Sequence, residues 1–490
     1  MSNINVSNLT FAYPGSYDNI FEAVSFQMDT DWRLGFTGRN GRGKTTFLNL
    51  LLGKYEYSGT ISTNVSFEYF PYEVLDKTAV TKDIIDRICD TEEWLLIREL
   101  SLLEVNDDVL FRPFNTLSNG EQTKVLLAAL FLKENNFLLI DEPTNHLDLH
   151  GRVTVASYLG SKSGYIVVSH DRAFLDGCAD HILSINRADI EVRRGNFSSW
   201  WENKQNQDAL EIAENQKLRK DIKRLKQSSR QKAVWSDKVE ATKFGNGPCD
   251  RGAIGAKAAK MMKRSKSLEK RMDKAIEDKS LLLKNLEKSD SLKISLLPYH
   301  SSQLVSLDNI SISYGSKTVC RNVNMTINRG DRVALCGSNG SGKSSIVKLI
   351  CGEDISYTGN LSIGSGLRIS YVSQDTSFLN GNLTDYARNN DIDESLFKAI
   401  LRKLGFTRIQ FDKDLSTFSA GQKKKTLIAK SLCEKAHLLV WDEPLNYIDV
   451  LSRMQIEDFL LEYKPTILFV EHDGVFCEKV ATVNIFLSSY

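Results

Sequence analysis

The sequence predicts an α/β protein in which one domain type occurs twice, with an α-helical hairpin between the copies. First, landmarks repeat: Lys343 follows Lys44 by 299 residues, and Ser419 follows Ser118 by 301. Second, a glycine-rich loop follows a strand-like segment in each half. Third, a polar, helix-prone segment separates the halves. Landmarks that keep one offset indicate a duplicated domain. We therefore expect three regions, at residues 1–200, 201–303 and 304–490.

The composition narrows the class of protein. A chain of 490 residues is long enough for about three domains. Lys and Arg number 63 against 62 Asp and Glu, so the total charge alone indicates no polyanionic partner. The start lacks a basic segment followed by an apolar run, and no apolar run reaches the roughly 18 residues of a membrane helix. The eight cysteines include no CxxC pair, which excludes the usual zinc and iron–sulfur patterns. We expect a cytoplasmic protein with reduced thiols and no membrane segment.

Each copy begins with a strand that ends in an aromatic residue. Residues 1–13 alternate apolar and polar side chains, as a half-buried strand does, and end at Tyr13. Tyr314 ends the matching segment 301 residues later. An aromatic ring before a phosphate-binding loop can stack on adenine, or it can pack as an ordinary core or edge tyrosine. The sequence leaves both interpretations open.

The next element of each copy is a strand followed by a loop of the form GxxxxGK[ST]. Glycines let backbone N–H groups curl around phosphates, and the helix that follows adds positive potential. The lysine of each loop is expected to reach the β- and γ-phosphates, and the Thr or Ser after it to bind Mg²⁺. The first loop consists of Gly38, Arg39, Asn40, Gly41, Arg42, Gly43, Lys44, Thr45 and Thr46. The second consists of Gly337, Ser338, Asn339, Gly340, Ser341, Gly342, Lys343, Ser344 and Ser345.

Paired carboxylates follow a second apolar strand in each copy. These are Asp141 with Glu142 and Asp442 with Glu443. The first carboxylate of a pair can hold Mg²⁺ through water, and the second can polarise the water that attacks the γ-phosphate. The alternative is a strand that simply ends in solvated acidic residues, but the matched distances to the loops favour the catalytic interpretation.

Two further landmarks complete each copy. His170 and His472 end apolar strands, 28 and 29 residues after the glutamates, and each precedes an aspartate. A γ-phosphate sensor is favoured there over a structural histidine. Polar turns also open helices in both copies, and such turns offer a hydroxyl and bare glycine amides to an anion. Their key residues, which also suit ordinary helix caps, are Ser118, Gly120, Ser419 and Gly421.

The linker differs from the copies in charge. Residues 201–290 contain 23 Lys and Arg and 14 Asp and Glu, a net of +9, and the rest of the chain has 40 against 48, a net of −8. Apolar residues at helical spacing in two stretches predict two helices of about 30 residues, roughly 45 Å long. The run Phe244 to Pro248 breaks any helix, so we expect a protruding hairpin with its tip near 241–256.

Taken together, these motifs resemble the ATP-binding cassette superfamily over both copies. The resemblance implies two tandem ATP-binding cassette (P-loop) domains that pair head to tail within a monomer, with ATP and Mg²⁺ between them. Each phosphate loop would face the Ser/Gly turn of the other copy: Lys44 with Ser419, and Lys343 with Ser118. The glutamine usual in that family is Gln374 in the second copy, as a Mg²⁺ ligand. Tyr72 stands at the matching place in the first copy.

Two fused cassettes with a basic linker and no membrane domain resemble the ABC-F branch, whose DEPTNHLD motif occurs in full at residues 141–148. The loop run GRNGRGKTT and the lysine-rich run after the tip are similar to the Lsa-type antibiotic-resistance proteins of that branch. The resemblance implies a partner, the ribosome, bound through rRNA at the tRNA exit site and peptidyl-transferase centre, and no DNA. The implied activity is protection from lincosamides, pleuromutilins and streptogramin A. The residues expected to contact rRNA are Phe244, Lys257, Lys260, Lys263, Arg264 and Lys266.

The sequence leaves three functions open. A ribosome-protecting ATPase is favoured, and drug susceptibility separates it from a general translation factor without drug protection. The ATPase subunit of a membrane transporter is the third, although the basic linker argues against it. Within the linker, Phe244 is either a cap on the hairpin or an rRNA contact, and the lysines either bind phosphate or form a solvated helix face.

Overall fold

The computed structural model of the chain describes the copies almost completely and the linker in part. The described residues form two compact units, residues 1–200 with 291–490, and residues 201–290. We call residues 3–200 the first copy and residues 297–487 the second copy. The described residues are 3–14, 19–133, 136–145, 147–186, 189–241, 263, 270, 297–315 and 317–487.

The strands of the first copy form two sheets. A small antiparallel sheet has the order β2-β1-β4, and a larger sheet has the order β5-β6-β7-β3-β8-β9, parallel except for its last pair. The alternation at the start of the sequence thus correctly predicted a strand, β1. The strands are β1 Asn3–Phe11, β2 Phe21–Asp29, β3 Arg33–Thr37, β4 Ser58–Ser62, β5 Ser66–Phe70, β6 Asn136–Asp141, β7 Tyr165–Val168, β8 His181–Asn186 and β9 Asp189–Arg194.

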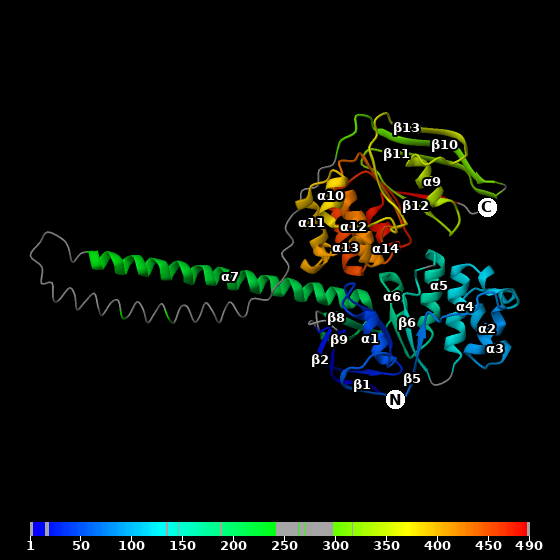
Figure 1. The fold of residues 1–490 in the computed structure, drawn as a ribbon, viewed down its shortest axis with the longest axis horizontal. Coiled ribbons are helices and arrows are strands. Elements are labelled where there is room, and N and C mark those ends of the chain that lie inside the picture. Colours follow the sequence, from blue (N-terminus) through cyan, green and yellow to red (C-terminus); the bar gives the residue numbers. More distant parts are fainter. Residues whose placement is uncertain are drawn as a thin grey trace, which may run out of the picture. The chain divides into compact units, whose positions relative to one another are not determined.

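Helices connect the parallel strands of this sheet, and α2, α3 and α4 gather into a helical subdomain (Figure 1). The helices of the first copy are α1 Lys44–Leu51, α2 Thr81–Ile88, α3 Glu93–Leu102, η1 Asp107–Phe111, η2 Phe114–Thr116, α4 Asn119–Phe131, α5 Leu149–Gly160 and α6 Arg172–Cys178.

The second copy repeats this architecture, with sheets in the orders β11-β10-β13 and β14-β15-β16-β12-β17. Its strands are β10 Gln303–Tyr314, β11 Lys317–Asn328, β12 Arg332–Gly337, β13 Tyr357–Ile363, β14 Ile369–Val372, β15 Leu438–Asp442, β16 Ile467–Val470 and β17 Val483–Leu487. Its helices are α9 Lys343–Ile350, α10 Leu383–Asn389, α11 Glu394–Lys403, η4 Arg408–Asp412, η5 Leu415–Thr417, α12 Ala420–Cys433, α13 Val450–Tyr463 and α14 Gly474–Val480. The predicted α/β duplication is therefore confirmed.

The central strands explain the apolar runs in the sequence. Every residue of β7 and of β16 is buried, because helices or the small sheet cover both faces of a parallel sheet. The parallel strands of each large sheet point the same way. The polar residues that follow them therefore collect along one edge.

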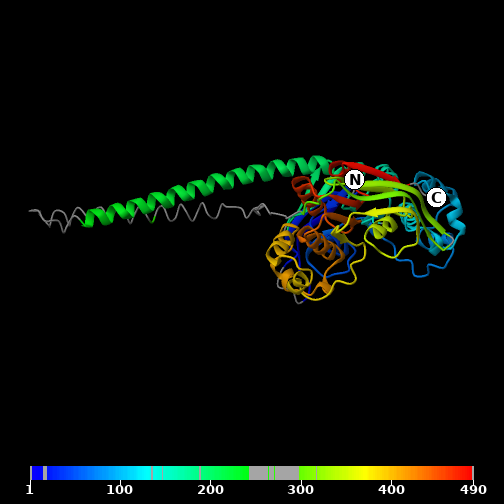
Figure 2. The same ribbon diagram turned by 90° about the horizontal axis from the view of Figure 1, so that it is seen from above.

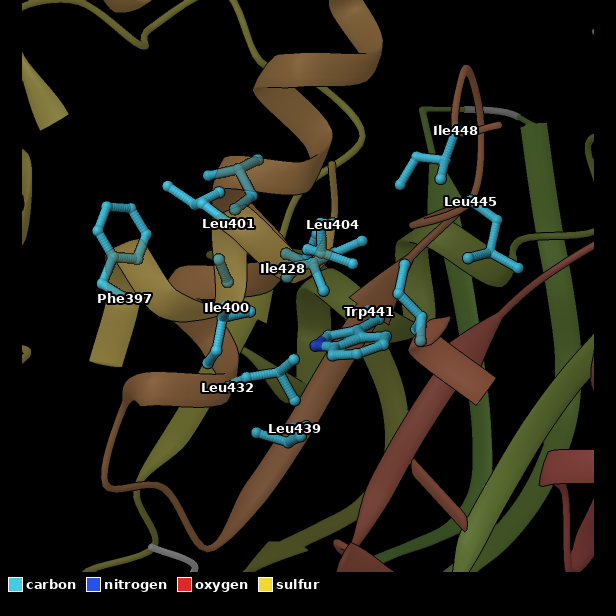
Figure 3. Close-up of a cluster of buried hydrophobic side chains, with 14 of the residues drawn as sticks. Phe397, Ile400, Leu401, Leu404, Ile428, Leu432, Leu439, Trp441, Leu445 and Ile448 are labelled. Carbon is cyan, nitrogen blue, oxygen red and sulfur yellow. The ribbon is translucent and has the colours of Figure 1, made fainter. Parts of the chain in front are cut away.

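Trp441 shows how one such strand is fixed against the helices. Its indole is fully buried between β15 and the helices α11 and α12, among Leu404, Ile428 and Leu432 (Figure 3). The indole N–H donates to Ser431 Oγ at 2.9 Å, so the buried polar edge is satisfied. This packing fixes the end of β15, where Asp442 and Glu443 follow.

The linker begins with a longer helix than predicted. Helix α7, Phe197–Ala241, has 45 residues rather than about 30, and it is one unbroken helix in both views (Figures 1 and 2). It is longer partly because it starts inside the first copy, where Phe197 and Trp200 are buried. The tip and second helix of the predicted hairpin lie outside the described residues, except for Lys263 and Lys270, which are helical.

Among the described residues, no helix has both the length and the apolar character needed to cross a membrane.

Candidate active site

The two glycine-rich loops lie at the carboxyl ends of β3 and β12, each directly before a helix. Their backbones need glycine: Gly43 and Gly342 have φ of 97° and 92°, in the left-handed region. A Cβ on Gly43 would also lie 2.5 Å from Ile20 Cγ2. The loops therefore have the strand–loop–helix context that binds phosphates.

The two loop lysines fold back over their own loops. Lys44 Nζ donates to Gly38 O at 2.8 Å, and Lys343 Nζ donates to Gly337 O at 2.9 Å and Ser338 O at 2.8 Å. Both ammonium groups are buried, and burial lowers their pKa. A nearby anion stabilises a buried cation that is held on backbone carbonyls. A phosphate beside each lysine, as the sequence predicts, would provide such an anion.

Side chains predicted to bind the metal contact each other in both copies. Thr45 Oγ1 donates to Asp141 Oδ2 at 3.0 Å, and Ser344 Oγ donates to Asp442 Oδ1 at 3.2 Å. A hydroxyl and a carboxylate are the hard oxygen donors that Mg²⁺ prefers, completed by substrate phosphate and water. These residues therefore fit a Mg²⁺ site.

Gln374, also predicted as a metal ligand, contacts Glu443. Its Nε2 donates to Glu443 Oε2 at 2.8 Å, so its amide contacts the predicted catalytic carboxylate. Asn446 Nδ2 donates to the same oxygen at 2.7 Å. The predicted role of Gln374 as a metal ligand stays a prediction.

Glu142 and Glu443 share an unusual backbone. Their φ values are 51° and 46°, which non-glycine residues rarely adopt. Each N–H is bonded to the neighbouring strand, to Val168 O at 2.9 Å and to Val470 O at 3.1 Å. Such strained residues concentrate at functional sites, and the same strain at equivalent positions supports a shared role.

The histidines stand beside these glutamates. His170 Nε2 lies 3.2 Å from Glu142 Oε1, and His472 Nε2 lies 3.8 Å from Glu443 Oε1. Burial lowers the pKa of His170 well below its usual value, so the ring is neutral. Within the described residues, Glu142 Oε1, His170 Nδ1 and His472 Nε2 are buried without a hydrogen-bond partner. Buried polar atoms left unsatisfied indicate a place for a polar ligand.

A cavity of about 630 Å³ brings the first loop together with the second copy. It is lined by Lys44, Asp141, Glu142 and His170 from the first copy and by Ser419 and Gly421 from the second. Asn40 Nδ2 also donates across it to Tyr447 O at 2.6 Å. The residues predicted for the first composite site therefore lie in one cavity.

The remaining predicted residues frame the two sites. Ser118 and Ser419 are helix N-caps whose hydroxyls accept from Glu121 N and Gln422 N, so each already has the capping role. Among residues of the first copy, Asp148 is close enough to Lys343 to act on its pKa. The pairing of Ser118 and Gly120 with the second loop stays a prediction.

The tyrosines lie beside the loops they precede. Tyr13 Oη and Thr46 Oγ1 are 2.8 Å apart, and Tyr314 Oη donates to Ser345 Oγ at 3.2 Å. Both rings are exposed, which leaves a face available for a base.

Of the predicted rRNA contacts, only Lys263 is described, as an exposed helical residue.

Two residues of the first site were missed from the sequence. Tyr69 Oη donates to Asp141 Oδ2 at 3.0 Å and lines the cavity. Tyr447, with φ of 63°, lines it from the second copy. The repeat contained a signal for the first of these, since Tyr371 lies 302 residues after Tyr69. Nothing comparable indicated Tyr447.

A family model described as ABC transporter matches residues 21–145 and 320–446, which cover both loops and both carboxylate pairs. The ribosome protection protein VmlR of Bacillus subtilis (strain 168) is 28% identical over 495 residues, covering 98% of this chain and 86% of that protein. The erythromycin resistance ATP-binding protein MsrA of Staphylococcus epidermidis is 29% identical over 493 residues, covering 94% of this chain and 93% of that protein.

Solved structures share the fold. A crystal structure of the complex of the archaeal ribosomal stalk protein aP1 and the archaeal ribosome recycling factor aABCE1 matches with a TM-score of 0.64 and 18% identity, covering 98% of this chain and 87% of that chain.

Proposed function

The chain belongs to the ABC transporter family as an ABC-F type ATP-binding protein with two cassettes, and we propose that it is an Lsa-type ribosome protection ATPase. It binds and hydrolyses ATP. The proposed function is release of antibiotics from the peptidyl-transferase centre, with lincosamides, pleuromutilins and streptogramin A as the drug classes. The observation that carries the ATP-driven part is the cavity in which Lys44 and Glu142 face Ser419 of the other copy.

The first composite site suggests how each residue contributes to hydrolysis. Lys44 neutralises phosphate charge, and the turn at Ser419 and Gly421 contacts the γ-phosphate from the opposite side. Glu142 polarises the attacking water, and the neutral His170 beside it senses the γ-phosphate. The second site assigns the same roles to Lys343, Glu443 and His472, with Ser118 and Gly120 opposite. Both sites therefore need the two copies together.

Mg²⁺ would be held by Thr45 with Asp141 in the first site and by Ser344 with Asp442 in the second, because these pairs offer hard oxygen donors. When bound, it neutralises negative charge on the β- and γ-phosphates. Tyr69 orients Asp141 in the first site through its hydrogen bond.

Ribosome binding is supported by the relatives and by the linker. The ribosome protection protein VmlR matches along 98% of this chain, so the likeness includes the linker as well as the cassettes. The net charge of +9 on residues 201–290 suits rRNA phosphate, which attracts Lys and Arg. The proposed docking place is the tRNA exit site, from which the linker reaches the peptidyl-transferase centre. We place the protein in the cytoplasm, as a monomer with paired cassettes, with domains at 1–200, 201–303 and 304–490.

The decisive experiment is translation in vitro with a lincosamide, a pleuromutilin or a streptogramin A, with and without this protein. We expect the drug concentration for half-inhibition to rise when protein and ATP are present, and to stay at its basal value with the Glu142→Gln, Glu443→Gln protein. Ribosome binding without any rise would favour a general translation factor, and no ribosome binding would exclude the proposed function.

The linker lysines have their own test. Replacing Lys257, Lys260 and Lys263 by Gln should weaken ribosome binding and flatten its salt dependence, with the slope falling by about one for each lysine that binds a phosphate. ATPase activity of the free protein should stay unchanged. An unchanged slope would instead identify these lysines as a solvated helix face.

The tip is tested separately. Phe244→Ala should lower drug protection at matched ribosome occupancy if the ring stacks on rRNA bases, since such stacking contributes about 1–3 kcal/mol. Full protection by this variant would assign Phe244 to capping the hairpin.

A further inference from the structure

A group of buried charged side chains lies where the two copies meet. Each member is at most 7% exposed, although ionised residues are almost never buried unless paired. The group contains three cations and three anions, so its formal charges cancel. We call it the interface network, and it consists of Arg152, Asp171, Arg172, Arg453, Glu457 and Asp473.

Two of its ion pairs are related by the repeat. Arg152 Nη1 donates to Asp171 Oδ2 at 2.9 Å, and Arg453 Nη1 donates to Asp473 Oδ2 at 3.2 Å. The arginines are 301 residues apart and the aspartates 302. Arg152 Nη1 also donates to His472 O at 3.2 Å, which links the two copies.

The third pair has no equivalent. Arg172 of the first copy donates to Glu457 of the second, with Nη1 at 3.2 Å from Oε2 and Nη2 on Oε1. The residues at the repeat-related positions are Gly474 and Ala156, which carry no charge. Among the described residues of the network, the only bidentate ion pair therefore occurs at just one of the two repeat-related places.

Both residues of this pair lie close in sequence to residues of the first nucleotide site. Arg172 begins α6, two residues after His170, whose ring stands beside Glu142. Glu457 lies in α13, which starts just after Tyr447, and Tyr447 lines the first cavity and accepts from Asn40. Opening the first site by separating the copies would therefore pull α6 away from α13.

We propose that the Arg172–Glu457 ion pair is a clamp on the first nucleotide site only, and that it slows the release of nucleotide from that site. Removing one partner of a buried, bidentate pair leaves the other charge unpaired in a water-poor interface, so the closed arrangement of the two helices depends on both residues. In place of the pair the second site has glycine and alanine, and His472 O there accepts a single hydrogen bond from Arg152 instead, so opening this site breaks no bidentate ion pair. Arg172 and Glu457 are positioning residues, and the proposal depends on ATP binding but not on ribosome binding.

The test is nucleotide release from protein in which Glu142→Gln and Glu443→Gln prevent hydrolysis. This protein is loaded with a fluorescent ATP analogue, 2′/3′-O-methylanthraniloyl ATP, and chased with unlabelled ATP without ribosomes. We expect two release phases. Adding Lys44→Ala removes the slow phase and adding Lys343→Ala removes the fast one, which assigns each phase to a site.

Variants of the clamp residues then distinguish the two sites. Arg172→Met should accelerate the slow phase about tenfold, a usual size for coupling between sites, and leave the fast phase unchanged. If Arg172→Met does not stay folded, Glu457→Gln takes its place. The swap Arg172→Glu with Glu457→Arg should restore most of the slow phase. Lys479→Met is the matched control, because Lys479 lies 3.6 Å from Glu457 but is half-exposed, and such a pair contributes little.

Three results would overturn the proposal. One is a single release phase in the parent protein, since the clamp predicts unequal sites. Another is an equal acceleration of both phases by Arg172→Met, which a loosened interface would give. The third is a charge-swapped protein that has the melting temperature of the parent but in which the slow release phase remains accelerated. None of these results bears on ribosome binding.

Discussion

At the first nucleotide site, the Oε1 atom of Glu142 accepts no hydrogen bond from the described residues, and burial raises the pKa of this carboxyl group. At the second, Glu443 accepts from Gln374 and Asn446. Burial alone would raise the pKa of Glu443, but the neighbouring histidine and two lysines outweigh it and hold the pKa below its usual value. Equivalent glutamates with the same backbone strain thus have opposite electrostatic surroundings. The difference teaches that a duplicated motif fixes where a carboxylate lies, whereas its neighbours fix its charge.

The largest expected effect concerns the glutamates themselves. Glu142→Gln with Glu443→Gln should lower ATP turnover by at least about a hundredfold while ATP binding persists, because an amide is a far weaker base than a carboxylate. The single variants sharpen the comparison, since each leaves one site active. Steady-state phosphate release measures both. Near-normal turnover in the double variant would refute the catalytic assignment of these glutamates.

A second comparison concerns stability near the two sites. Lys425 Nζ donates to Asp449 Oδ2 at 2.6 Å, and both side chains are buried. The equivalent residues of the first copy, Lys124 and Asp148, are only half-buried. Lys425→Met should lower the free energy of unfolding by about 3–5 kcal/mol, because it leaves a buried carboxylate without its partner.

The matched variant Lys124→Met should change the free energy of unfolding by less than about 0.5 kcal/mol. Chemical denaturation followed by circular dichroism measures both. Equal decreases in the two variants would mean that the structural difference between the two lysine–aspartate positions has no energetic consequence.

The sequence predicted the fold and much of the candidate site. The repeat located both loops, both glutamates and the helices at Ser118 and Ser419, because each is a local motif with its own spacing. It did not predict the Arg172–Glu457 pair, since those residues are 285 positions apart and meet only when the copies pack. The same limit applies to Tyr447, whose contact with the first site depends on the other copy. Local periodicity also underestimated α7, because its first turn is buried in the first copy.

The smallest expected effect concerns the metal ligand of each site. Tyr69 Oη donates to Asp141 Oδ2, whereas no hydrogen bond joins Tyr371 to Asp442 in the described structure. Tyr69→Phe keeps the ring and removes only the donor that orients the Asp141 carboxylate. Groups that orient a metal ligand affect metal affinity, and we expect about a tenfold rise in the Mg²⁺ concentration needed for half-maximal turnover.

The measurement is a Mg²⁺ titration of ATP turnover in the Glu443→Gln background, where the first site alone is active. Tyr371→Phe in the Glu142→Gln background is the control, and its Mg²⁺ requirement should stay constant, since among the described residues Asp442 accepts from Ser344 but not from Tyr371. If Tyr69→Phe and Tyr371→Phe shift the requirement equally, the tyrosines act through ring packing that both copies share. If only Tyr69→Phe shifts it, the hydroxyl orients Asp141 and the two metal sites differ as their hydrogen bonds do.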